Sequence, residues 1–275
     1  AIALAANVFR PIATLSDEIQ ELQAASAGAV RINGFLAFAE EPAKRPGVTA
    51  ARIKAKGPGV LIAARKLSFR YPDGADYVVK DLDFTIDPLE KVTFSGRTGV
   101  GKSTLFKLML GLYKPTSGHI YINGYDSYDL PDEMKREVFG YVEQGFRFIT
   151  GTIAEQITLR DPAITLAQVR QAMDDVGLDA YVMGLPLGYD TKAQAALFSK
   201  GQSQLLGVAR ALAKNPPLML LDEISANLDS KTELAIVTAI EKGASQRTVV
   251  SISHRLMDAK VFERNIVIKS AHGAA

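Results

Sequence analysis

The chain has 275 residues, of which 47% are apolar and 23% are charged, proportions that indicate a globular protein with a buried core. Its formal net charge of +2 is too small to indicate a nucleic-acid partner, and the absence of cysteine excludes disulfides and thiolate metal sites. A chain of this length forms one large α/β domain or two small ones.

The first predicted element is a helix over residues 1–38. Apolar residues recur there at three- and four-residue steps, which places them on one stripe of a helix. The stripe consists of Leu15, Ile19, Leu22, Ala25, Ala29, Ile32 and Leu36. It fits an amphipathic helix docked on a domain, and it also fits the extension of a membrane helix. The chain contains no run of about eighteen apolar residues, so no segment is expected to span a bilayer by itself.

Residues 41–59 are expected to form a linker, because Pro and Gly recur there without any helical or strand period. The segment is also basic, with Lys44, Arg45, Arg52, Lys54 and Lys56. Such a segment could lie near anionic lipid headgroups, although runs of charge are more often simply solvated.

Strands are predicted over residues 60–69, 77–79, 82–86 and 92–94. The last of them leads into a Gly-rich stretch with the spacing G-x-x-x-x-G-K-S. This stretch comprises Gly96, Arg97, Thr98, Gly99, Val100, Gly101, Lys102 and Ser103, followed by Thr104. A helix is expected to begin near Gly101 and to end near Leu112.

The residue types of this stretch suit phosphate binding. Glycines let backbone N–H groups close around phosphate oxygens, and the N-terminus of the following helix adds its positive dipole end. Lys102 can reach the β- and γ-phosphates of a nucleotide, and the Ser103 hydroxyl can ligate Mg²⁺. The alternative is a Gly-rich turn with a solvated lysine.

The second half of the chain alternates between strands and helices. A hairpin is predicted at residues 119–122, with Asn123-Gly124 as its turn and His119 as a surface residue rather than a ligand. Residues 150–215 are expected to be mainly helical. Further strands are expected over 138–142, 217–221 and 248–252, and a helix over 230–242. Strands that alternate with helices indicate a parallel sheet.

Three chemically active residues follow predicted core strands. Asp222 ends an apolar strand and is followed by Glu223, while His254 follows the strand over 248–252. Ligands of open parallel sheets bind outside the carboxyl ends of the strands, so these side chains are expected to converge with the Gly-rich stretch. Asp222 could hold Mg²⁺ through water, and Glu223 could orient or deprotonate a water molecule. The alternatives are an acidic pair that caps a helix and a histidine that is satisfied within the fold.

Together these motifs resemble the nucleotide-binding domain of ATP-binding cassette (ABC) transporters. Leu218-Met219-Leu220-Leu221-Asp222-Glu223 is similar to the Walker B motif of that family, and residues 96–104 are similar to Walker A. Phe198-Ser199-Lys200-Gly201-Gln202 resembles the family signature LSGGQ, and Ala209-Arg210-Ala211-Leu212 its following helix. The remaining matches are Gln144 with the Q-loop, residues 226–229 with the D-loop, His254 with the switch histidine and Tyr71 with the adenine-stacking aromatic residue. The resemblance extends over residues 60–268.

The resemblance implies a role for each matched residue. Tyr71 would stack on adenine, and residues 96–104 would hold the phosphates of ATP. Ser103, Gln144 and Asp222 would order Mg²⁺. Glu223 would be the general base, assisted by Gln144 and by His254 at the γ-phosphate. Ser199, Gly201 and Gln202 would contact ATP bound to a second cassette, which could be identical or different.

The resemblance also implies an architecture. The expected fold class is α/β, with a RecA-like P-loop NTPase core, an antiparallel β subdomain and an inserted α-helical subdomain at about 150–215. The N-terminal segment resembles the end of the last transmembrane helix of exporter-type half-transporters. Residues 1–40 would then extend that helix, 41–59 would be a linker, 60–269 the ATPase domain and 270–275 a tail. The expected place is the cytoplasmic face of a membrane, attached to a transmembrane domain, with no nucleic acid as partner.

Several positions depart from the family pattern. Lys200 replaces the first glycine of the signature, so it adds charge near the opposing ATP and is expected to forbid glycine-only backbone angles. Asn227 replaces the D-loop alanine, and residues 191–197 match poorly. Two alternatives to an exporter ATPase are a soluble cassette ATPase that remodels ribosomes or DNA and a regulatory module that binds ATP and only dimerises.

Overall fold

The computed structural model describes residues 2–37, 53, 57–72, 74–224, 230–243, 245–253 and 262–269. The predicted D-loop at residues 226–229, His254 and the predicted tail at residues 270–275 lie outside the described residues. The chain divides into two compact units, Ala1–Ala43 and Lys44–Ala275.

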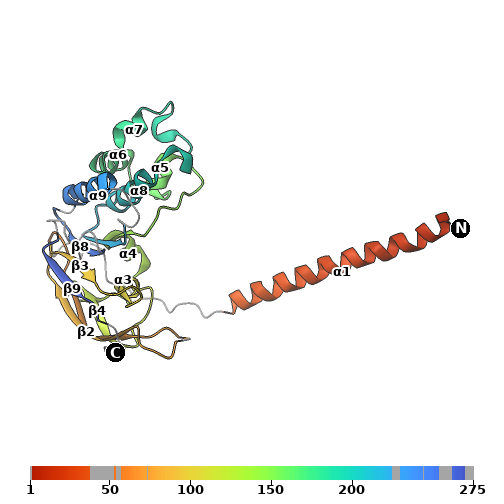
Figure 1. Ribbon diagram of the computed structural model, residues 1–275, viewed down its shortest axis with the longest axis horizontal. Helices are drawn as coiled ribbons and strands as arrows, with labels where there is room; N and C mark the ends of the chain where they lie inside the picture. The colour runs from red at the N-terminus through yellow and green to blue at the C-terminus, as the bar shows by residue number, and fades with distance from the viewer. Residues whose placement is uncertain are drawn as a thin grey trace. The chain divides into compact units, whose positions relative to one another are not determined.

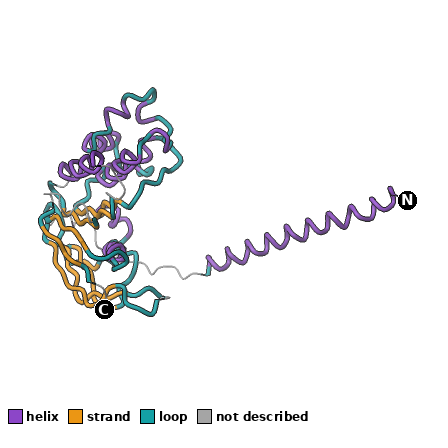
Figure 2. The backbone as a smooth tube through the Cα atoms, in the orientation of Figure 1, coloured by secondary structure: helices purple, strands orange, loops and turns teal. Residues whose placement is uncertain are grey.

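In the described part of the first unit the chain forms one helix, α1, over Ile2–Leu36 (Figures 1 and 2), as the sequence predicts. Five large apolar side chains of the predicted stripe are exposed: Leu15, Ile19, Leu22, Ile32 and Leu36. Within the part of the chain that the structure describes, no helix combines the length and the apolar character that crossing a membrane requires.

The second unit contains an antiparallel sheet with the strand order β2-β1-β4-β5. Its strands are β1 Ile62–Phe69, β2 Val79–Ile86, β4 Ser117–Ile122 and β5 Tyr125–Asp126. The strands predicted over 77–79 and 82–86 form a single strand, because β2 is continuous from Val79 to Ile86 and pairs with β1 across two register shifts. The predicted turn at Asn123-Gly124 is confirmed: both residues have positive φ, 49° and 87°, as a tight hairpin turn requires.

The other sheet has the strand order β6-β7-β8-β3-β9, and every neighbouring pair is parallel, which confirms the prediction. Its strands are β3 Lys91–Ser95, β6 Phe139–Val142, β7 Leu218–Asp222, β8 Thr248–Ile252 and β9 Arg264–Val267. Strand β6 begins one residue later than predicted, because Val138 ends helix α4 (Asp132–Val138). Parallel pairing brings the carboxyl ends of all five strands to one edge, where the candidate site lies.

Most of the described helices of the second unit lie in the segment 150–215 and gather at one end of that unit, as Figures 1 and 2 show. They are α5 Ile153–Thr158, α6 Leu166–Asp175, α7 Asp179–Met183 and α8 Lys200–Leu212, with the 3-10 turns η1 Gly188–Asp190 and η2 Ala195–Leu197. Helix α9 spans Ser230–Gly243. Helix α3 spans Lys102–Met109 and ends earlier than predicted, because Gly111 has a φ of 62° and lies against the Ser127 carbonyl, where a Cβ would be 2.1 Å away.

The parallel sheet separates two apolar cores. Along β7, Leu218 and Leu220 belong to the core shared with α3 and the antiparallel sheet, while Met219 and Leu221 belong to the core shared with α5, α6, α8 and α9. This alternation follows from the two-residue period of a strand, and it explains why β7 is apolar at every position before Asp222. Packing on both faces fixes the strand, and with it the position of Asp222 at its end.

Candidate functional site

The Gly-rich stretch forms a loop between β3 and α3, as predicted. Gly96, Gly99 and Gly101 have φ angles of 147°, 82° and 101°, which side chains rarely tolerate. Space is a second constraint, because a Cβ on Gly101 would lie 2.8 Å from the Val78 side chain. The loop leads directly into the N-terminus of α3, whose free N–H groups favour an anion.

Lys102 is buried within this loop. Only 5% of the residue is exposed, and its Nζ donates hydrogen bonds to the carbonyls of Gly96 at 2.7 Å and Arg97 at 3.1 Å. A buried ammonium group needs such partners, and carbonyl oxygens satisfy its donors without neutralising its charge. The loop therefore holds an uncompensated positive charge at its centre, which suits a phosphate group.

Asp222 at the end of β7 lies beside the start of α3. Its Oδ1 accepts a hydrogen bond from Ser103 Oγ at 3.2 Å, and its Oδ2 accepts one from the Tyr141 hydroxyl at 3.1 Å. Burial raises the pKa of Asp222, and the charge of Glu223 adds to this, while the hydrogen bonds from Tyr141 and Ser103 oppose it. The structure thus brings Ser103 and Asp222 together, although 119 positions of sequence separate them.

The donor set at this point fits Mg²⁺. The ion prefers oxygen ligands and is usually held by one or two carboxylates together with substrate phosphates, rather than by a full protein cage. The Ser103 hydroxyl and the Asp222 carboxylate lie side by side here, next to the Gly-rich loop. Among the described residues there is no group of three or more His, Cys, Asp or Glu side chains that could hold a metal ion.

Glu223 directly follows β7 in a left-handed backbone conformation with a φ of 48°. Its N–H donates to the carbonyl of Ile252 at 2.9 Å, which ties the residue to the end of β8. Such a conformation costs on the order of 1–3 kcal/mol for a residue other than glycine and is found most often at functional sites. The hydrogen bond to β8 therefore fixes the backbone of Glu223, whose side chain is half-buried.

Gln144 is exposed in the loop after β6. The backbone on either side of it is fixed by one buried side chain, Gln204 of α8. The Gln204 amide accepts a hydrogen bond from the Gly145 N–H and donates one to the Glu143 carbonyl, both at 3.2 Å. The position of Gln144 is thus linked to the helix that carries the signature-like sequence.

Tyr71 lies beside the phosphate-type loop. Its hydroxyl and that of Thr104 are 3.0 Å apart, and its ring makes edge contacts with Phe69 and Tyr113 at centroid distances of 5.0 and 5.4 Å. These three aromatic residues line a cavity of about 480 Å³, together with Arg70, Pro72, Gly74, Lys114 and Thr116. The hydrogen bond between Tyr71 and Thr104 therefore holds the aromatic surface of this cavity next to the Gly-rich loop.

The signature-like residues begin helix α8. Ser199 is its N-cap and forms a capping box with Gln202: Ser199 Oγ accepts from the Gln202 N–H at 3.1 Å, and the Gln202 side chain accepts from the Ser199 N–H at 2.9 Å. Gly201 packs against α9, where a Cβ would lie 2.3 Å from Thr232 Cγ2. In Figure 1, α8 lies among the other helices and α3 lies beside the strands, so Ser199, Gly201 and Gln202 form a group separate from the loop.

Lys200 was expected to forbid glycine-only backbone angles, and the structure confirms this expectation. The residue is the first of helix α8 and has no positive φ, so the helix accepts a side chain there without strain. The Lys200 side chain is exposed at the helix N-terminus, where it adds a positive charge to the positive end of the helix dipole.

The structure adds two residues that the sequence analysis missed, Tyr141 and Gln204. Each contacts a predicted site residue or its loop across 59 or more positions of sequence. The only sequence signal for Tyr141 was its place on the strand that leads to Gln144. His254 lies outside the described residues, so its predicted role stays a prediction.

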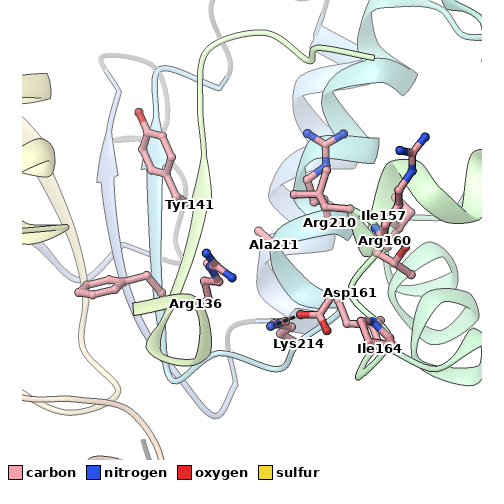
Figure 3. A pocket seen from close by; sticks show the side chains of 14 residues that line it. Arg136, Tyr141, Ile157, Arg160, Asp161, Ile164, Arg210, Ala211 and Lys214 are labelled. Atoms are coloured by element: carbon pink, nitrogen blue, oxygen red, sulfur yellow. Dashed lines mark hydrogen bonds and ion pairs between the residues drawn. The ribbon is translucent and has the colours of Figure 1, made fainter. Parts of the chain in front are cut away.

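A further cavity of about 630 Å³ lies between α4 and β6 on one side and α5 and α8 on the other (Figure 3). Tyr141 borders it from β6, while Arg160 and Arg210 border it from the opposite side. Lys214 forms ion pairs with Asp161 and, at 3.4 Å, with Glu137 at its margin. Among the described residues, none of those predicted to bind nucleotide or metal lines this cavity.

Comparisons with known proteins agree with the geometry. The family model described as "ABC transporter" matches residues 79–226. Putative multidrug export ATP-binding/permease proteins of Staphylococcus aureus strains NCTC 8325 and bovine RF122 are 34% and 33% identical over 208 residues. A solved structure of a bacterial Atm1-family ABC exporter with ATP bound is similar with a TM-score of 0.71 and 29% identity over 84% of this chain.

These relatives are longer than the chain. The matched segment covers 75% of this chain but only 36% of each Staphylococcus aureus protein, and 39% of the solved exporter structure. The chain therefore corresponds to a part of the proteins that it resembles.

Proposed function

Because the chain belongs to the ABC transporter family, we propose that it is the ATP-binding and ATP-hydrolysing domain of an exporter. The fold is that of an ABC ATPase, an α/β core with parallel and antiparallel sheets. The observation that carries the proposal is the buried Lys102 inside the Gly-rich loop, next to the Ser103–Asp222 pair. A loop built in this way offers N–H groups and an ammonium group to phosphates and oxygen ligands to a cation.

In this proposal, ATP occupies the loop at residues 96–104 and its adenine stacks on Tyr71. The aromatic cavity at Tyr71 supports the placement of the base, because an adenine ring is flat and favours an aromatic face. Ser103, Gln144 and Asp222 would hold Mg²⁺, which supplies positive charge to the phosphate oxygens when it is bound.

Hydrolysis is assigned to Glu223, assisted by Gln144 and His254. The Glu223 carboxylate accepts the proton of the attacking water, and the backbone bond to Ile252 keeps the residue at the sheet edge. His254 donates a hydrogen bond to the γ-phosphate. The position of Gln144 depends on Gln204, which forms hydrogen bonds with the backbone on both sides of it.

The proposal includes two partners. A second cassette, identical or different, places its own ATP against Ser199, Gly201 and Gln202 of this chain, where the N-terminus of the 13-residue helix α8 offers N–H groups to the γ-phosphate. A transmembrane domain precedes the helical extension at residues 1–40 and the linker at 41–59. The ATPase domain, residues 60–269, and the tail, 270–275, then lie at the cytoplasmic face of the membrane.

Replacement of Glu223 by glutamine tests the proposal. We expect Glu223→Gln to bind ATP with Mg²⁺ as the wild-type chain does and to lose most of its turnover, because the amide keeps the shape of the side chain but cannot accept a proton. Phosphate release and calorimetric ATP binding are measured on the purified chain. Glu241→Gln, which changes an exposed glutamate of α9, is the matched control and should hydrolyse ATP normally. Undiminished turnover by Glu223→Gln would refute the assignment of the base.

A further inference from the structure

Tyr141 is not a proposed metal ligand, but it forms a hydrogen bond with one, Asp222. The residue belongs to β6, which pairs with β7, and its hydroxyl donates to Asp222 Oδ2 at 3.1 Å. The other carboxylate oxygen, Oδ1, accepts from Ser103 at 3.2 Å. Both oxygens of Asp222 are thus held by hydroxyl groups from two different elements, β6 and α3.

The two hydroxyl groups differ in what they do when a metal ion binds. In the proposed function Ser103 would itself be a ligand, so its oxygen would serve the ion instead of fixing Asp222. A neutral phenol is a poor ligand for Mg²⁺, so Tyr141 would keep its hydrogen bond to Asp222 Oδ2. Asp222 Oδ1 would then remain directed toward Ser103. A tyrosine hydroxyl is protonated at neutral pH, so it is a donor to the carboxylate oxygen that it contacts.

We propose that Tyr141 is a positioning residue that orients the Asp222 carboxylate for binding of the Mg²⁺–ATP complex. The inference rests on the proposed function, because it assigns Asp222 to the metal. Hydrogen-bond partners of metal-binding carboxylates orient the ligand, and their loss typically weakens metal binding by roughly 10- to 100-fold. Tyr141 also borders the cavity of about 630 Å³, which Ser103 and Asp222 do not line (Figure 3).

The test is Tyr141→Phe, which removes the hydroxyl and keeps the ring. Calorimetry on the purified chain measures ATP affinity first in EDTA and then during a Mg²⁺ titration. We expect unchanged ATP affinity in EDTA and an increase of about tenfold in the Mg²⁺ concentration that gives half of the metal-dependent gain in affinity. Tyr181→Phe is the matched control, because Tyr181 is also 38% exposed and also donates one hydrogen bond, to the Leu197 carbonyl.

The outcomes separate this inference from the function on which it rests. If the wild-type chain shows no Mg²⁺-dependent gain in ATP affinity, the proposed metal site is wrong and the inference falls with it. If the wild-type chain shows the gain and Tyr141→Phe needs no more Mg²⁺ than Tyr181→Phe, only the positioning role is wrong. An equal loss of ATP affinity in EDTA and in Mg²⁺ would make Tyr141 a structural residue and would also overturn the inference.

Discussion

Lys102 illustrates at the scale of one residue how a sequence motif becomes a defined local structure. Its side chain is not a solvated lysine of a Gly-rich turn, because it is buried and donates to two carbonyls of its own loop. Ser103 and Thr104, the next two residues, reach out of the loop to Asp222 and Tyr71. Three consecutive side chains therefore connect the loop to itself, to the end of β7 and to the aromatic cavity.

We predict that Lys102→Ala weakens ATP binding at least tenfold, because the variant loses the positive charge that the loop encloses. Calorimetric titration with Mg²⁺–ATP measures the effect. Lys80→Ala, which changes an exposed lysine of β2, should bind ATP as the wild-type chain does. Equal affinities for Lys102→Ala and the wild-type chain would contradict the role of the buried ammonium group.

Helix α8 shows how much one element contributes to the site. Its first turn carries the signature-like residues, and its buried Gln204 holds the loop at Gln144. Further along the helix, the Arg210 guanidinium lies 4.2 Å from the centroid of the Phe146 ring and donates a hydrogen bond of 2.7 Å to the Gln156 carbonyl. Burial lowers the pKa of Arg210, which is consistent with a guanidinium group enclosed by loop and ring. Helix α8 thus contacts the loop after β6 through Gln204 near its start and Arg210 near its end.

Two of the capping boxes in the second unit allow the structural and functional roles of Ser199 to be separated. Ser199 caps α8 and Thr165 caps α6 in the same way. We predict that Ser199→Ala and Thr165→Ala each lower the free energy of unfolding by about 1 kcal/mol, because each leaves a helix N–H without its acceptor. Urea denaturation measures this loss.

The same pair of variants differs in the proposed assembly. Only Ser199→Ala should weaken ATP-dependent association of two chains, since Thr165 lies in another helix and has no part in the proposed contact with ATP. A similar loss of association in both variants would assign Ser199 to helix stability alone.

At the scale of the whole molecule, the separation of two groups of residues has a consequence. The loop at residues 96–104 belongs to the part built on the sheets, and Ser199, Gly201 and Gln202 belong to the helical part. In the proposed function, each group completes a site only with the other group of a second chain, so the γ-phosphate of ATP becomes part of an interface.

This arrangement predicts that Glu223→Gln, which retains ATP, associates into dimers in the presence of Mg²⁺–ATP and stays monomeric with Mg²⁺–ADP. Sedimentation velocity on the purified chain measures the two states. ADP lacks the γ-phosphate that would contact α8 of the second chain, so the nucleotides serve as their own control. Dimers of equal stability with both nucleotides would show that the γ-phosphate does not join the chains.

The sequence by itself determined the features that depend on neighbouring residues. The G-x-x-x-x-G-K-S spacing predicted a Gly-rich loop between a strand and a helix, Asn123-Gly124 predicted a tight turn, and the apolar runs at β7 and β8 predicted buried parallel strands. These features are local because each depends on the backbone preferences or on the burial of a single element.

Only the tertiary structure decided the contacts between distant parts of the chain. The pairing of Tyr141 with Asp222, the hold of Gln204 on the loop at Gln144 and the close packing of Gly201 on Thr232 each depend on which elements become neighbours. The continuous β2 is a further case, since its pairing with β1 overrode a local break in the strand pattern. Such contacts leave no period or motif in one sequence, because the residues that make them are brought together by the order of strands in the sheets and by the helices that pack on them.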